Sequence, residues 1–256
     1  MRTHIGTMGW SYKFWTGKFY PERLKPDGFL AEYAKHFVSV EVDSTFYRIP
    51  SETTVEKWKT QTPNEFTFAL KFPRVITHVK MLHDCEEQTE AFMRSASQLH
   101  PKLGPLLVQL PPQFKPNRLS TLKDFLSVLP KGFLYAVELR NKEFKETRLS
   151  TMLANRQTAL VVNDLAVLDT TMLTVEFAYV RWEGDRNSVK GTLGKTEVDR
   201  TSDIESWAQK ISNLGNRVTD LFGYFSKYYS GYPPDDAEQL SRLLAPSKIP
   251  PRTELN

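Results

Sequence analysis

The chain has 256 residues, of which 40% are hydrophobic and 25% are charged, as is usual for a folded globular protein. Its length matches one (β/α)8 barrel, and its net charge of +4 indicates an anionic partner only weakly. The only cysteine, Cys85, excludes an internal disulfide and any multi-cysteine metal centre made by one chain.

Eight short apolar runs recur along the chain and alternate with amphipathic stretches, the order expected of strands joined by crossover helices. We expect strands at His4–Gly9, Phe37–Asp43, Phe66–Phe72, Pro105–Leu110, Leu134–Arg140, Thr158–Asp164, Phe177–Trp182 and Leu221–Phe225. This pattern predicts an α/β fold, a single (β/α)8 TIM-type barrel over residues 1–245. The tail over residues 246–256 is expected to be irregular because prolines interrupt it.

No stretch approaches the ~18 to 20 apolar residues that cross a bilayer. The amino terminus from Met1 to Trp10 is polar before it becomes strand-like. With a single cysteine, these features predict a cytoplasmic protein without a membrane partner. They do not indicate an oligomeric state.

Two connections, Ser11–Pro26 and Glu183–Thr201, are longer than a barrel needs, and long loops on this face usually shape sites. The first interleaves aromatic side chains with lysines and arginines. Such a mixture suits either a packed lid or a surface that stacks bases and neutralises phosphates. The second carries glycines and basic residues without a Walker motif, so a phosphate-gripping cover and a solvated loop are both open.

Side chains along a strand alternate between two faces, and the polar set is expected to point toward the barrel axis. The expected inward charges lie at strand ends: Glu41, Asp43, Lys71, Glu138, Arg140, Arg181 and Glu183, joined by Gln109 and by Asn163 or Asp164. A charge on an inward face costs several kcal/mol unless it is paired or hydrated. Because barrel interiors are normally filled by branched apolar residues, this set favours a site at the carboxyl-terminal mouth.

Two interpretations of these charges remain open. In the functional one, Lys71, Arg140 and Arg181 grip an anionic group while Glu41 or Glu138 takes or gives a proton. In the other, the charges neutralise one another and merely close the barrel mouth with ion pairs.

Several motifs resemble the DUF72 family, also called YecE-like proteins, from end to end. They are Gly6-Thr7-Met8-Gly9-Trp10-Ser11-Tyr12, Glu41-Val42-Asp43-Ser44-Thr45-Phe46-Tyr47, Lys71-Phe72-Pro73-Arg74, Gln109-Leu110-Pro111-Pro112, Glu138-Leu139-Arg140 and Tyr179-Val180-Arg181. The resemblance implies a TIM-type barrel and brings no established biochemical function. It therefore predicts the fold and leaves the activity open.

The chain departs from the usual family pattern near the expected site. Asp43 stands where Asn is usual, Trp182-Glu183-Gly184 replaces an aromatic–His–Gly arrangement, and Ser226-Lys227 stands in place of an Asn pair. If those groups handle substrate elsewhere in the family, this member either acts on a variant substrate or has lost activity. The sequence does not choose between these outcomes.

His78 follows the third strand and is a candidate proton shuttle. With Glu41, Glu138 and Asp164 it also offers ligands for a divalent metal, but no tight ligand motif such as His-Glu-x-x-His is present. We predict no metal site and no cofactor, with a divalent metal as the lesser alternative.

The sequence thus predicts an enzyme that uses acid–base chemistry on a small phosphorylated or carboxylated substrate, a hydrolase or isomerase without a nucleotide cofactor. Glu41, Glu138 and His78 are the candidate catalytic residues. The candidate substrate-binding residues are Trp10, Tyr12, Asp43, Tyr47, Lys71, Gln109, Arg140, Asp164, Arg181 and Glu183. A nucleic-acid-binding or nuclease-like barrel and a non-catalytic scaffold are the alternatives.

Overall fold

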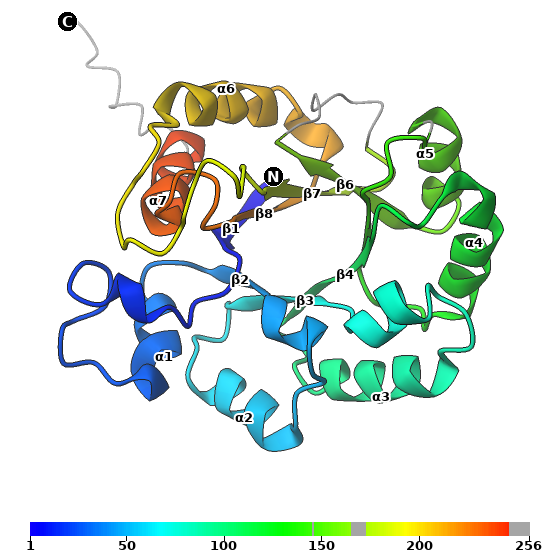
Figure 1. Cartoon of the computed structure of the whole chain (residues 1–256), viewed down its shortest axis with the longest axis horizontal. Coiled ribbons are helices and arrows are strands. Elements are labelled where there is room, and N and C mark those ends of the chain that lie inside the picture. The colour runs from blue at the N-terminus through cyan, green and yellow to red at the C-terminus, as the bar shows by residue number, and fades with distance from the viewer. Residues whose placement is uncertain (145, 165–172, 246–256) are drawn as a thin grey trace, which may run out of the picture.

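The computed structural model describes residues 1–144, 146–164 and 173–245, which form a barrel of eight parallel strands with helices outside it (Figure 1). The strands are β1 (Arg2–Thr7), β2 (Ser39–Val42), β3 (Thr67–Lys71), β4 (Leu103–Leu110), β5 (Tyr135–Leu139), β6 (Thr158–Asn163), β7 (Phe177–Trp182) and β8 (Asp220–Phe225). They are hydrogen-bonded in the order β1-β8-β7-β6-β5-β4-β3-β2. The predicted (β/α)8 fold is confirmed, and the predicted tail lies outside the described residues.

Among the described residues, a helix follows every strand except β6. The helices are α1 (Phe29–Tyr33), α2 (Glu52–Thr60), α3 (Glu86–Ser97), α4 (Leu119–Val128), α5 (Glu146–Ala154), α6 (Thr201–Ser212) and α7 (Pro233–Leu244). Each strand differs from its predicted bounds by at most a few residues. The second is two residues shorter at its start and ends before Asp43, because Asp43–Phe46 turn into a 3-10 helix at the barrel mouth.

The barrel closes between β1 and β2 by fewer hydrogen bonds than join its other strands. A single bridge pairs Met8 with Glu41, and the Gly9 N–H donates to the Glu41 carbonyl at 2.8 Å. Gly6 permits this approach, since a Cβ there would fall 2.1 Å from the carbonyl oxygen of Ser39. The buried Tyr33 hydroxyl helps to join the two strands by contacting the Thr7 N–H at 2.9 Å and the Ser39 carbonyl at 3.1 Å.

Apolar side chains pack against both faces of the sheet. The larger cluster lies between strands and helices, and a smaller cluster fills the barrel interior with residues such as Met8, Ala69, Ala136, Tyr179 and Tyr224. Ala69 and Ala136 belong to the predicted inward faces, so the predicted alternation of these strands is confirmed. Residues two positions further along the same faces reach the carboxyl-terminal mouth.

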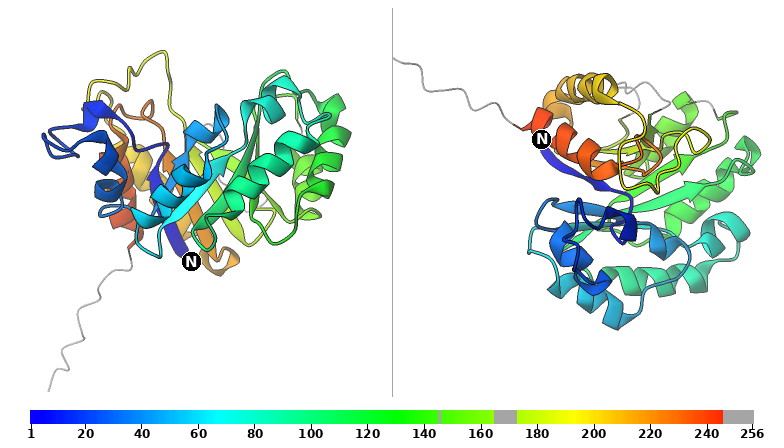
Figure 2. Two further views of the ribbon diagram at one scale, coloured as in Figure 1. Left: turned by 90° about the horizontal axis from the view of Figure 1, so that it is seen from below. Right: turned by 60° about the vertical axis from the view of Figure 1, so that its left-hand side comes forward.

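The two long connections lie side by side at that mouth (Figure 2), where a Cβ at Gly194 would fall 2.2 Å from the Phe14 carbonyl oxygen. In the first connection Trp15 and Tyr20 are fully buried, which is the packing of a lid and removes both rings from any base-stacking surface. In the second, the Glu197 carboxylate accepts the backbone N–H groups of Lys190 and Gly191 at 2.9 and 2.7 Å. In the described part of the chain, no helix combines the length and apolar character needed to cross a bilayer.

Candidate functional site

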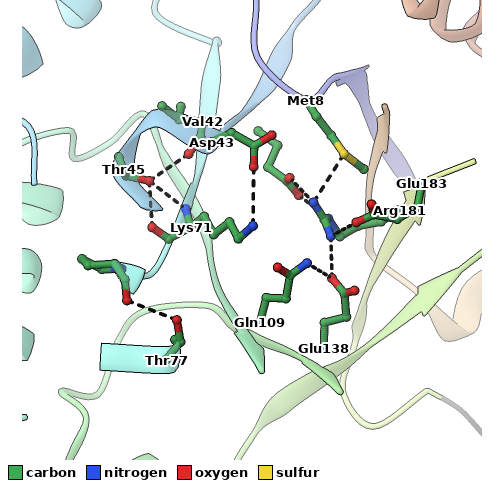
Figure 3. Close-up of polar contacts among 12 residues, drawn as sticks. Met8, Val42, Asp43, Thr45, Lys71, Thr77, Gln109, Glu138, Arg181 and Glu183 are labelled. Atoms are coloured by element: carbon green, nitrogen blue, oxygen red, sulfur yellow. Dashed lines mark hydrogen bonds and ion pairs between the residues drawn. The ribbon is translucent and has the colours of Figure 1, made fainter. Parts of the chain in front are cut away.

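Arg181, near the end of β7, is the centre of a buried ionic network (Figure 3). Its Nε and Nη2 donate to the two carboxylate oxygens of Glu41 at 2.9 and 2.8 Å, and Nη1 donates to Glu138 at 2.5 Å and also to Glu183. Nη2 also lies 3.3 Å from the sulfur of Met8. These contacts engage all five N–H groups of the guanidinium. The geometry therefore does not support the predicted direct contact between Arg181 and an anionic substrate.

Glu41 enters the network from β2, and its side chain is 0% exposed. Besides Arg181, the carboxylate accepts the Tyr179 hydroxyl at 2.7 Å. Burial alone would lower the pKa of Arg181, but Glu41, Glu138 and Glu183 raise it well above its ordinary value, so the cation is permanent. A carboxylate buried against a permanent cation cannot reach a substrate, and the geometry does not support proton transfer by Glu41.

Glu138, on β5, is held from three sides. The Arg140 Nε donates to one oxygen at 2.9 Å, while Gln109 Nε2 and Arg181 donate to the other. Burial raises the pKa of Glu138, but Arg181 and Arg140 outweigh it and bring the pKa to about 2. The carboxylate is thus ionised at any pH near neutrality and too weak a base to exchange a proton efficiently. Its predicted catalytic role is not supported, and Gln109 orients Glu138 rather than a substrate.

Arg140 and Glu183 lie further out. The Nη2 of Arg140 donates to Glu183 at 2.7 Å, and the Arg140 side chain is 33% exposed. The Asp164 carboxylate, whose pKa is raised by burial, accepts the backbone N–H groups of Glu183 and Gly184 at 3.1 and 2.8 Å. Asp164 therefore shapes the chain after β7. No described residue accepts a hydrogen bond from Nη1 of Arg140, so this side of the guanidinium remains available.

Lys71 ends β3, and its amine points into the space between Asp43, Gln109 and Arg181 (Figure 3). The side chain is 11% exposed, and Nζ lies 3.8 Å from a carboxylate oxygen of Asp43. The amine also lies 4.2 Å from the centre of the Phe46 ring. Burial lowers the pKa of Lys71, with Asp43 opposing the shift. Among the described residues, none accepts a hydrogen bond from this amine within 3.5 Å.

His78 lies in a helical turn after β3 (Val75–Val79) and packs edge-on against Phe46 with ring centres 4.9 Å apart. Its Nδ1 is 2.9 Å from the Thr77 hydroxyl. Burial lowers its pKa to about 4, and Lys71 and Arg140 add to the shift. His78 is thus neutral at pH 7. Since the Phe46 ring contacts both the His78 ring and the Lys71 amine, His78 and Lys71 lie on the same rim.

The remaining predicted binding residues lie around this rim or away from it. The hydroxyl of Tyr12 donates to the Met8 carbonyl at 2.8 Å, and burial and Asp43 raise its pKa. Trp10 packs edge-on against Trp58 with ring centres 5.8 Å apart. Tyr47 is 80% exposed and packs only against Phe46 among the described ring contacts. No contact with a charged group of the site is found for the rings of Trp10 and Tyr47 among the described contacts, so their predicted binding roles stay predictions.

The site therefore has two layers. In the inner layer Glu41 and Glu138 are fixed by Arg181; the outer layer, here called the mouth cluster, consists of Asp43, Lys71, His78, Arg140 and Glu183. Within the described residues, no three His, Cys, Asp or Glu side chains are placed to hold a metal ion. Arg181 occupies the space between Glu41 and Glu138, so the predicted metal donors do not form one set there.

Sequence reasoning missed Met8, Phe46 and Tyr179. Tyr179 shares the inward face of Arg181 and could have been included by the same alternation. Met8 and Phe46 carry no charge, so the alternation of polar residues does not select them, and their place in the family motifs is the signal that could have found them.

Comparison with known proteins identifies the family and the fold. The family model described as "Protein of unknown function DUF72" matches residues 4–255. The UPF0759 protein YecE of Escherichia coli is 38% identical over 55% of this chain, an alignment that covers 49% of YecE itself. The UPF0759 protein YunF of Bacillus subtilis is 28% identical over 94% of both chains.

Among solved structures, a DUF72 family protein from Thermotoga maritima superposes with a TM-score of 0.79 at 26% identity, covering 95% of this chain and 99% of that one. Sequence motifs, family model and fold thus agree over the whole barrel. The chain belongs to the DUF72 family.

Proposed function

We propose that the protein is an enzyme that uses acid–base chemistry on a small phosphorylated or carboxylated substrate at the barrel mouth. The observation that carries the proposal is the contrast between the two layers. The inner cation, Arg181, donates to three carboxylates and to the Met8 sulfur, whereas Lys71 and Arg140 keep N–H groups that no described residue accepts. Donors of this kind at the barrel mouth, one on the buried Lys71 and one on the partly exposed Arg140, favour an anionic oxygen group.

Charge balance limits the kind of anion. The mouth holds four carboxylates, Glu41, Asp43, Glu138 and Glu183, against the three cations Lys71, Arg140 and Arg181. Arg186, whose Nη2 lies 4.0 Å from Glu183, brings the count to parity. Binding must therefore rest on directed donors rather than on a large positive field, which favours a compact carboxylate or phosphate held at close range.

Two groups of the mouth cluster are better placed to meet a substrate than the predicted glutamates, which Arg181 engages. Asp43 is partly exposed and lies beside the Lys71 amine. His78 is a neutral imidazole at pH 7 because its pKa is about 4, and it can accept a hydrogen bond from a substrate hydroxyl. A substrate that presents an anion to Lys71 and Arg140 would place its hydroxyl groups against these acceptors.

A scaffold without activity would need only the inner layer, because its ion pairs already close the barrel. The outer layer distinguishes the enzyme from the scaffold. A lysine amine without a hydrogen-bonded acceptor contributes little to stability, so a scaffold has no need of Lys71. Replacing Lys71 should thus affect ligand binding more than folding.

Thermal unfolding against a panel of small phosphates and carboxylates tests the proposal. A ligand at a hundred times its Kd stabilises by about 2.7 kcal/mol, or roughly 5 to 11 °C for a chain of this size. We expect at least one compound to produce this shift, and Lys71→Met and Arg140→Met to abolish it. Lys131→Met, an exposed lysine before β5 at the opposite end, is the matched control and should keep the shift. Equal shifts in all variants would overturn the proposal.

A further inference from the structure

Among the lysines that the structure describes, two are buried, and they differ in how their amines are hydrogen-bonded. Lys102, just before β4 at the amino-terminal end, is 6% exposed and donates to the Lys59 carbonyl, the Thr62 carbonyl and the Thr62 hydroxyl at 2.7, 2.7 and 3.1 Å. Three acceptors satisfy the three hydrogens of an ammonium group. Lys102 is therefore a structural cation.

Lys71, 9% exposed at the other end of the barrel, lacks such acceptors among the described residues. Its nearest carboxylate, Asp43, stands at 3.8 Å, beyond hydrogen-bond distance. The ring of Phe46 and the carboxylate favour the charged form, whereas burial and Arg181 favour the free amine, and the balance lowers the pKa. A desolvated lysine beside another cation is the environment that activates an amine as a nucleophile.

We propose that Lys71 forms an imine with the carbonyl group of the substrate, so that the site takes aldehydes or ketones that carry a carboxylate or phosphate. This inference rests on the proposed function and narrows its substrate class. Arg140, with its free Nη1 side, holds the anionic group while the carbonyl carbon faces the Lys71 amine. Lys71 is then a catalytic residue and not only a cation.

The step balances without any further reagent. The lone pair of the neutral Lys71 amine forms an N–C bond to the carbonyl carbon, and the C=O π pair moves to oxygen. Asp43, 3.8 Å from the amine, takes a proton from the nitrogen and delivers it to the oxygen, directly or through one water. Asp43 then takes the remaining proton of the nitrogen and passes it to the hydroxyl, so that the C–O bond breaks, water leaves and a neutral C=N bond to Lys71 remains.

Reductive trapping tests the inference on the full chain. The protein is incubated near neutral pH with glyoxylate or glyceraldehyde 3-phosphate and sodium cyanoborohydride, and the adducts are mapped by peptide mass spectrometry. Because burial lowers the pKa of Lys71, a larger share of its amine is unprotonated near neutral pH, and we expect Lys71 to be labelled in preference to the exposed lysines. Label at this peptide should vanish in Lys71→Arg and persist in Lys131→Arg.

The corresponding alcohols, glycolate and glycerol 3-phosphate, separate the two proposals because they carry the anion but cannot form an imine. Stabilisation by the alcohols without an adduct at Lys71 would overturn the imine and leave the proposed function standing. Label spread equally over exposed lysines, and unchanged in Lys71→Arg, would likewise overturn it. If neither stabilisation nor an adduct is found with these probes or the wider panel, both proposals fail.

Discussion

Replacing Arg181 by Met keeps a side chain of similar length and removes the cation that Glu41 and Glu138 share. Both carboxylates would then be buried without their partner, at 0% and 3% side-chain exposure. Removing one member of a buried ion pair typically costs 3 to 5 kcal/mol because the remaining charge is left uncompensated. For a chain of this size, about 2 to 4 °C per kcal/mol predicts a Tm lower by roughly 6 to 20 °C.

Urea unfolding followed by circular dichroism at pH 7 measures the loss. Arg140→Met is the matched control, because its side chain is 33% exposed and water can replace the lost contacts. Adding Glu41→Gln to Arg181→Met removes one uncompensated charge, so the double variant should lose at least about 1 kcal/mol less than the sum of the two single variants. Additive effects, or a loss in Arg181→Met below about 1 kcal/mol, would refute the buried network as a structural unit.

Three further predictions concern stability. Because the pKa of Glu138 is depressed to about 2, its contribution is complete above its ordinary value near 4.5 and is lost as the pH falls toward 2, so Glu138→Gln should flatten the acid limb of a Tm–pH curve. Burial raises the pKa of Asp236 to about 7, so its contribution to the free energy of unfolding is complete below pH 4 and is lost as the pH rises through 7. The fall in Tm between pH 5 and 8 should therefore be smaller in Asp236→Asn than in the unmodified protein, and an equal fall would contradict this. Gly184→Ala should lower the Tm strongly, since Gly184 has φ +66° and a Cβ would lie 2.0 Å from the Tyr228 carbonyl oxygen; a neutral effect in differential scanning calorimetry would count against the described turn.

The sequence was sufficient to predict the fold and the inward faces. Alternation along β2, β5 and β7 identified Glu41, Glu138 and Arg181 as inward residues, and the structure places all three in one network. This succeeded because the period of a strand is fixed at two residues, so one apolar face determines the other.

Alternation does not tell which inward residues lie at the same height, because that depends on the register between strands. Gln109 is paired with Glu138 across β4 and β5, and this register explains their hydrogen bond. Sequence reasoning therefore treated seven charges as one ring, whereas the register and the stagger of the barrel separate a buried inner layer from an outer one. Arg181 therefore lies in the inner layer and Lys71 in the outer one.

The most direct test of the two-layer site is a crystal structure of the protein grown in selenate, with the anion located by its anomalous scattering. The account predicts selenate bound by the Lys71 amine and the Nη1 side of Arg140, with Arg181 still bonded to Glu41 and Glu138 beneath it. Selenate bound elsewhere with the mouth empty, or a Lys71 amine bonded to a carboxylate in place of the anion, would contradict it.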